Sequence, residues 1–131
     1  TSALILVGKK MPENRRDDMC TKNELNSILQ KLTQIYRSVY GENLVQVILY
    51  GSYARGDYHT DSDVDVVAIV HGDRKTLQQQ LKKVWDSSCE LELEYDTILS
   101  PTVIPYEEFK QYQTVLPYYR NISQEGVVIS A

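Results

Sequence analysis

Cysteine is scarce in this sequence, because its 131 residues include only Cys20 and Cys89. Two cysteines argue against a disulfide framework and against a four-ligand zinc site, so we expect free thiols in a reducing, cytoplasmic compartment. Long apolar runs are also missing, and none approaches the roughly 20 residues that a membrane helix needs. The apolar segment at residues 3–7 follows no basic stretch, which argues against a signal peptide.

Positive charge is scarce as well: 14 Lys and Arg residues stand against 18 Asp and Glu residues, which gives a net charge of -4 and a pI of about 5.1. This balance argues against a basic groove that follows DNA or RNA. A nucleotide ligand stays open, because a bound divalent cation can supply the missing positive charge. The length and the 42% of apolar residues are typical of one globular domain.

The chain divides into an extension and a domain. Residues 1–20 are rich in charge and have no sustained apolar period, so we predict an extension there and a single domain over residues 21–131. Thr21 and Glu24 form a capping box, which predicts the start of a helix. Apolar residues at helical spacing follow, and Gly41 stands where that helix should end.

The predicted sheet begins with two β-rich runs, at residues 45–50 and 64–70. The second run is almost continuously apolar, as is typical of a strand in the centre of a sheet. Asp73 follows as the expected N-cap of a second helix, whose apolar residues continue at helical spacing as far as Trp85.

Strict alternation over residues 89–99 predicts a third strand. Its polar face would carry Glu92, Glu94 and Asp96, and the prolines that follow should end it. A short helix over residues 106–112 and a last strand over 127–129 complete the prediction. This order of elements favours an α/β or α+β fold, in which helices cover a sheet.

The most informative residues lie where the first predicted strand ends and the second begins: Gly51-Ser52 in one turn, and then Asp63 and Asp65. Glycine lets the backbone approach a ligand closely, and the serine hydroxyl can donate to a phosphate. Arg55, in the same turn, could reach a phosphate or brace the loop. Together with the Asp pair, these residues predict a site for a metal and a nucleotide.

Asp63 and Asp65 favour a cation because they are two residues apart at the start of a strand, which places both carboxylates on one face. Like charges held that close repel each other, and a bound cation relieves the repulsion. Magnesium commonly takes one or two carboxylates together with substrate phosphates.

The same residues have plainer interpretations. Asp and Ser are common in turns, so Asp-x-Asp alone could mark only the entry to a strand. An EF-hand is excluded, because the sixth and twelfth positions counted from Asp61 are Val66 and Gly72 where Gly and Glu are required. A P-loop is excluded too, because its Gly-x-x-x-x-Gly-Lys-Ser/Thr motif is absent.

Gly51-Ser52, about ten further residues and then Asp63-Val64-Asp65 resemble the signature of the DNA polymerase β-like nucleotidyltransferases. The resemblance covers roughly residues 22–100, and without a second domain the chain is similar to the minimal nucleotidyltransferases, or MNT proteins. It implies a mixed sheet flanked by helices, a nucleoside triphosphate donor and Mg²⁺. It also implies that Gly51 and Ser52, helped by Arg55, hold the triphosphate and that Asp63 and Asp65 hold the metals.

The family takes its third carboxylate from a later strand. We predict Asp96 for that place, as a metal ligand and as the base that activates the attacking hydroxyl. Glu92 and Glu94 lie on the same face of the predicted strand and remain alternatives.

The resemblance also implies a reaction: transfer of a nucleoside monophosphate, AMP from ATP, to a hydroxyl, with release of pyrophosphate. MNT proteins are often the antitoxin partners of helical HEPN toxins, so we expect the acceptor on a partner protein, with a homo-oligomer as another source of acceptor recognition. Two other functions stay open, a nucleotide-binding regulatory or antitoxin subunit without catalysis and a stand-alone enzyme acting on a small molecule. We expect no role at a membrane.

Overall fold

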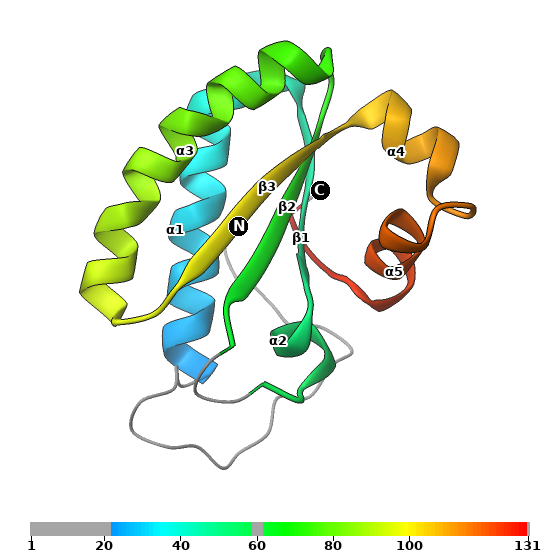
Figure 1. Ribbon diagram of the computed structural model, residues 1–131. Helices are drawn as coiled ribbons and strands as arrows, with labels where there is room; N and C mark the ends of the chain where they lie inside the picture. The colour runs from blue at the N-terminus through cyan, green and yellow to red at the C-terminus, as the bar shows by residue number, and fades with distance from the viewer. Residues whose placement is uncertain (1–21, 59–61, 131) are drawn as a thin grey trace.

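The computed structural model describes residues 22–58 and 62–130 and builds them around one four-stranded sheet (Figure 1). The strand order is β3-β2-β1-β4. Strand β2 pairs antiparallel with β1 and parallel with β3, and β1 pairs antiparallel with β4. The strands are β1 (Leu44–Tyr50), β2 (Val64–Val70), β3 (Leu99–Pro105) and β4 (Val127–Ser130). The predicted mixed sheet flanked by helices is thus confirmed.

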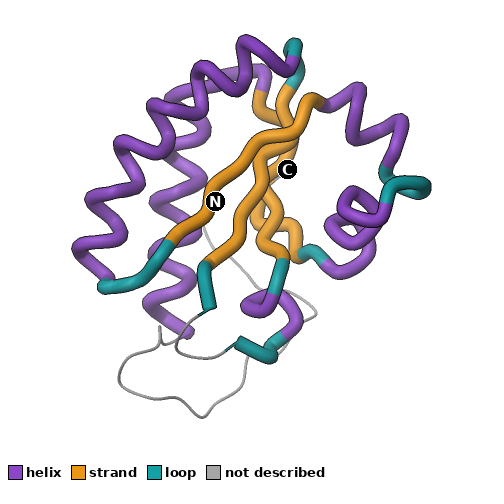
Figure 2. Tube along the Cα trace, in the orientation of Figure 1, coloured by secondary structure: helices purple, strands orange, loops and turns teal. Residues whose placement is uncertain are grey.

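Helices cover both faces of the sheet. In Figures 1 and 2, α1 and α3 lie on one side, α4 and α5 lie on the other, and α2 lies at the end of the sheet where β1 stops. The helices are α1 (Lys22–Tyr40), α2 (Ser52–Arg55), α3 (Arg74–Tyr95), α4 (Tyr106–Tyr112) and α5 (Pro117–Glu125), with a 3-10 turn η1 (Gly41–Asn43) after α1. Among the described residues, no helix is both long and apolar enough to cross a membrane.

The larger core lies between the sheet and the pair α1 and α3. Helix α1 contributes a fully buried stripe at helical spacing, Leu25, Ile28, Leu29, Leu32 and Tyr36. The Tyr36 hydroxyl reaches the carbonyl oxygens of Thr102, at 2.7 Å, and Val66, at 3.3 Å, so it satisfies polar backbone beneath the helix. The helix follows the sequence prediction; its expected cap at Thr21 and the extension at residues 1–20 lie outside the described residues.

A smaller core lies on the other face of the sheet. There, α4 and α5 bury Phe109, Tyr119 and Ile122 against the strands. The strand residues of this cluster are Ile48, Val67, Ile69 and Ile104. Because side chains alternate along a strand, β2 sends Val67 and Ile69 to this face and Val64, Val66 and Ala68 to the larger core.

The predicted strand over residues 89–99 is wrong, because α3 continues to Tyr95. Asp73 is its N-cap as predicted, and the Asp73 side chain accepts a hydrogen bond from the Thr76 amide. The buried positions of α3 keep helical spacing along its whole length: Leu77, Leu81, Val84, Ser88 and Leu91. Ser88 occupies a core position, which hides the period in the sequence, and Leu93, which completes the apparent alternation, is 85% exposed.

The third strand is instead β3, which contains both Pro101 and Pro105. It lies at the edge of the sheet with β2 as its strand neighbour, and an edge strand tolerates proline where no amide is needed for pairing. The carbonyl oxygen of Pro101 accepts a hydrogen bond from the Trp85 indole nitrogen at 2.9 Å, so α3 covers part of this edge. Helix α5 was not predicted, although Pro117 stands at its first turn, where proline is favoured.

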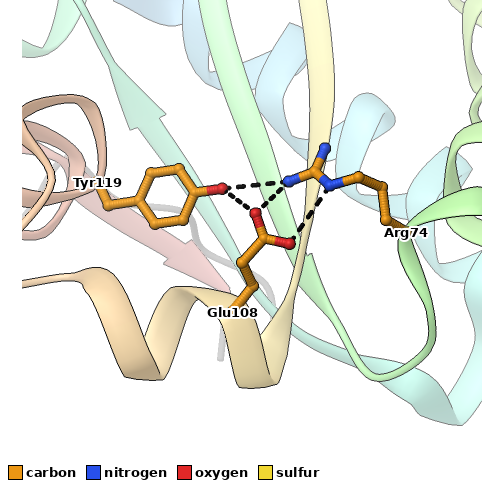
Figure 3. A network of polar contacts seen from close by, with 3 residues as sticks. All are labelled: Arg74, Glu108 and Tyr119. Carbon is orange, nitrogen blue, oxygen red and sulfur yellow. Dashed lines mark hydrogen bonds and ion pairs between the residues drawn. The ribbon is translucent and has the colours of Figure 1, made fainter.

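A polar network joins α3 to the layer formed by α4 and α5 (Figure 3). The Arg74 guanidinium donates to both carboxylate oxygens of Glu108 and, at 3.1 Å, to the Tyr119 hydroxyl, which itself donates to Glu108. The hydrogen bonds from Arg74 lower the pKa of Glu108. Burial, followed by the contact with Glu108, raises the pKa of Tyr119 to about 12.

The substitution Glu108→Gln should destabilise the protein by about 1 kcal/mol at neutral pH, because it keeps the size of the side chain and removes the charge that Arg74 pairs with. The folded pKa of Glu108 is lowered, so its contribution is complete above the ordinary carboxyl pKa of 4.5 and is lost as the pH falls through the folded value. Urea unfolding of the wild type and of Glu108→Gln at several pH values measures both free energies of unfolding. The difference between them should become smaller below pH 4.5. Glu107 is an exposed neighbour on α4, so Glu107→Gln is the control and should have the free energy of unfolding of the wild type.

Candidate functional site

The sheet brings the two halves of the motif together. The antiparallel register of β1 and β2 places Tyr50 opposite Asp65, so the Gly51-Ser52 turn that follows β1 meets the start of β2. Figure 2 shows both at the same end of the sheet, beside α2. Four residues predicted from the sequence, Gly51, Ser52, Asp63 and Asp65, therefore meet in one place.

Gly51 lies directly against the carboxylate of Asp65. A Cβ atom at residue 51 would collide with Oδ2 of Asp65, so the carboxylate would have to move. The backbone of Gly51 also has a φ of +79°, which residues with a Cβ rarely adopt. Glycine is therefore favoured here for two independent reasons, and the acidic side chain is packed against the turn.

The two carboxylates are charged neighbours at the edge of the fold. Asp63 and Asp65 are each partly buried. Burial and, second, the charge of Asp63 raise the pKa of Asp65, and the charge of Arg55 opposes this shift. An ionised pair of this kind is unfavourable without a cation, and two carboxylates are a donor set that suits Mg²⁺ when substrate phosphates complete the coordination. The residues present thus fit a divalent cation.

Arg55 ends the short helix α2 beside this pair. Its Nε donates to Asp57 at 3.2 Å, and its Nη1 lies 3.7 Å from Glu125 on α5. The guanidinium is about half exposed, and its hydrogen bond to Asp57 raises its pKa. Arg55 therefore carries a fixed positive charge near Asp65 and also connects α2 to α5.

The segment predicted as the strand that carries Asp96 belongs to α3 instead, so the element was predicted wrongly, and the role of Asp96 as the third carboxylate stays a prediction. Asp96 is the exposed C-cap of α3, with a φ of 52°, and does not lie on a strand. Across residues 22–58 and 62–130, no three His, Cys, Asp or Glu side chains form a group that could hold a metal ion. The two alternatives are engaged elsewhere on α3: Glu92 accepts from the Leu99 amide at 2.8 Å, and Glu94 pairs with Lys31 at 3.2 Å.

Ser100 stands where the third carboxylate was expected. The parallel register of β2 and β3 pairs it with Asp65, and its hydroxyl donates to Oδ2 of Asp63 at 3.1 Å. Ser100 was not predicted, because the family pattern has a carboxylate in that place and because the prolines of β3 are unusual in a strand.

Tyr50 and Tyr118 form a second feature that the sequence did not reveal. Their hydroxyls lie 3.1 Å apart, and their rings meet edge to face at 6.0 Å. Burial and the hydrogen bond to Tyr118 raise the pKa of Tyr50 well above its ordinary value. Tyr50 is the strand neighbour of Asp65 on the side opposite Ser100, and its hydroxyl is hydrogen-bonded to Tyr118 on α5.

Comparison with known proteins agrees with this geometry. The family model described as "Nucleotidyltransferase domain" matches residues 13–129. The chain belongs to the nucleotidyltransferase domain family. This nucleotidyltransferase domain is 35% identical over 80 residues to "Putative protein adenylyltransferase MJ0141" of Methanocaldococcus jannaschii, a match that spans 61% of this chain and 79% of that protein.

Two further similarities complete the comparison. "Putative protein adenylyltransferase MJ0604" of the same archaeon is 28% identical over 101 residues, which are 77% of this nucleotidyltransferase domain and 93% of that protein. A solved structure described as "toxin-antitoxin with AMP-PNP" superimposes with a TM-score of 0.48 at 19% identity, over 81% of this chain and 71% of that chain.

The substitution Gly51→Ala should reduce nucleotidyl transfer by about 100-fold, because the new Cβ displaces the Asp65 carboxylate from the turn by roughly an ångström. Gly41→Ala is the matched control, since Gly41 also has a positive φ, of 60°, but a Cβ there meets nothing within 4 Å. Both variants should lose about 1–2 kcal/mol of stability from backbone strain. Steady-state rates together with melting curves separate the two effects, and equal rates in the two variants would contradict this account of the site.

Proposed function

We propose that this nucleotidyltransferase domain transfers AMP from ATP to a hydroxyl group on a partner protein. The observation that carries the proposal is the junction where the Asp65 carboxylate packs against Gly51, with Asp63 two residues away. The names of the two archaeal relatives, which describe protein adenylyltransferases, support AMP as the transferred group and a protein as the acceptor.

The proposed reaction is an in-line displacement at the α-phosphorus of ATP. The acceptor oxygen forms a bond to that phosphorus while the bond to the oxygen bridging the α and β phosphates breaks, and pyrophosphate leaves. The proton of the acceptor hydroxyl passes to solvent water. A Mg²⁺ ion held by Asp63 and Asp65 would neutralise the negative charge on the phosphate oxygens.

The residues of the turn would hold the rest of the triphosphate. Gly51 lets the backbone approach the β and γ phosphates, and the Ser52 hydroxyl is an additional donor. The charge of Arg55 lowers the pKa of Asp65, so a phosphate bound to a cation held by Asp63 and Asp65 would also be attracted by Arg55. Its present partners, Asp57 and Glu125, would then compete with the phosphate for the guanidinium.

The acceptor in this proposal comes from outside the chain. The resemblance to MNT proteins points to a helical HEPN toxin as that partner, and a second copy of this chain is the other source. A nucleotide-binding regulatory subunit without catalysis is the second candidate function. One observation favours it: Ser100 occupies the strand position where a catalytic carboxylate was expected.

ATP labelled at the α-phosphate tests the proposal when it is incubated with the protein, Mg²⁺ and a lysate of the source cell. We expect label on one protein, no label when the γ-phosphate carries it, and no label with Asp65→Asn. The variant should melt no lower than the wild type, because it removes the charge that repels Asp63, and its inactivity will therefore not reflect unfolding.

Two results would overturn the proposal. Equal labelling by Asp65→Asn and the wild type would exclude the acidic pair from catalysis. Absence of label on any macromolecule, with binding of Mg²⁺ and ATP still measured by calorimetry, would favour the regulatory subunit.

A further inference from the structure

We infer that Ser100 is a positioning residue for Asp63 and that the acidic pair holds a single divalent cation. The inference rests on the proposed function, because it concerns the same site.

The β3 side of the pair carries a hydroxyl and no carboxylate. Residues Leu99–Pro105 form β3, and none of them is Asp or Glu. Ser100 is the register partner of Asp65 and donates to Asp63 at 3.1 Å, so it contacts the pair directly. Thr102, two positions further along β3, carries a second hydroxyl, which donates to the Val66 carbonyl oxygen at 3.3 Å.

The β1 side carries a hydroxyl as well. Tyr50 is the antiparallel partner of Asp65, and its oxygen is hydrogen-bonded to that of Tyr118. Ser100 therefore donates to the pair, Tyr50 is engaged with Tyr118, and neither adds negative charge at neutral pH. Within the described residues the pair supplies two negative charges, and no third acidic side chain joins it.

Two negative charges do not suit two divalent cations. Cations in a two-metal site lie about 3.5–4 Å apart, where their repulsion must be offset by bridging carboxylates. The triphosphate can supply further oxygen ligands to a cation on the donor side of the site. Among the described residues, the side chain that β3 offers to a second cation on the acceptor side is that of Ser100, which carries no charge.

In a site with one cation, the hydrogen bond from Ser100 would orient the Asp63 carboxylate. A carboxylate that binds a metal is held in orientation by hydrogen bonds from neighbouring groups, and loss of such a bond typically weakens metal binding by about 10–100-fold. Ser100 donates to one oxygen of Asp63 and leaves the other oxygen for the cation. It therefore acts through Asp63 and not on the substrate.

Equilibrium dialysis against Mn²⁺ tests this inference in the presence of saturating α,β-methylene-ATP, an analogue from which pyrophosphate cannot leave. The wild type should bind one Mn²⁺ per chain, and Ser100→Asp should bind two, because the new carboxylate supplies the missing ligand. Ser100→Ala should still bind one, with an affinity about 10-fold lower. Ser100→Thr keeps the hydroxyl and should restore wild-type affinity. Melting curves confirm that each variant is folded.

The outcomes that would overturn the inference are distinct. Two Mn²⁺ ions on the wild type, or one on folded Ser100→Asp, would refute the single-cation site and leave the proposed transfer reaction intact. Unchanged affinity in Ser100→Ala would refute the positioning role. No Mn²⁺ on the wild type would refute the inference and the proposed function together.

Discussion

The packing of the Asp65 carboxylate against Gly51 is the constraint on which the site depends. The register of β1 against β2 fixes Tyr50 opposite Asp65, so the next residue must turn directly over the acidic side chain. A Cβ at this turn would displace the Asp65 carboxylate, and residues with a Cβ rarely adopt the φ of +79° that leads the chain into α2. The positions of Ser52 and Arg55 relative to the acidic pair follow from this one contact.

The two faces of the sheet differ in what they bury. The face under α1 and α3 is a continuous apolar core, whereas the face under α4 and α5 combines a smaller core with the acidic end of β2. Asp65 lies on this second face, because side chains alternate along β2 and Val64 and Val66 enter the larger core. The network of Arg74, Glu108 and Tyr119 connects α4 and α5 to α3. It therefore helps to hold the helices that cover the face of the sheet on which Asp65 lies.

Much of this arrangement could be predicted from the sequence. The helix that became α1, the strands β1 and β2 and the N-cap at Asp73 each have a strong local signal, and the Gly-Ser and Asp-x-Asp motifs lie at the strand ends where they were expected. These features depend on short-range periodicity and on turn chemistry, which a single sequence records directly.

The wrong predictions concern α3 and β3, whose structure depends on contacts between residues that are distant in the sequence. Ser88 is buried in the contact between α3 and the core, so the apolar period weakens there and the alternation of Leu91, Leu93 and Tyr95 imitates a strand. Pro101 and Pro105 are compatible with β3 only because it is an edge strand. Asp96 was therefore assigned to the wrong element, and the place of Ser100 beside Asp63 is set by a parallel register that no local pattern encodes.

The most direct measurement of the central claim is paramagnetic broadening of amide NMR signals by Mn²⁺ in the presence of ATP. This account predicts that broadening is strongest at Gly51, Asp63, Asp65 and Ser100. Signals at the opposite end of the sheet, around Val70 and Asp73, should keep their width. Broadening centred on Asp96, or spread evenly along the acidic residues of α3, would contradict the assignment of the site to the junction between β1 and β2.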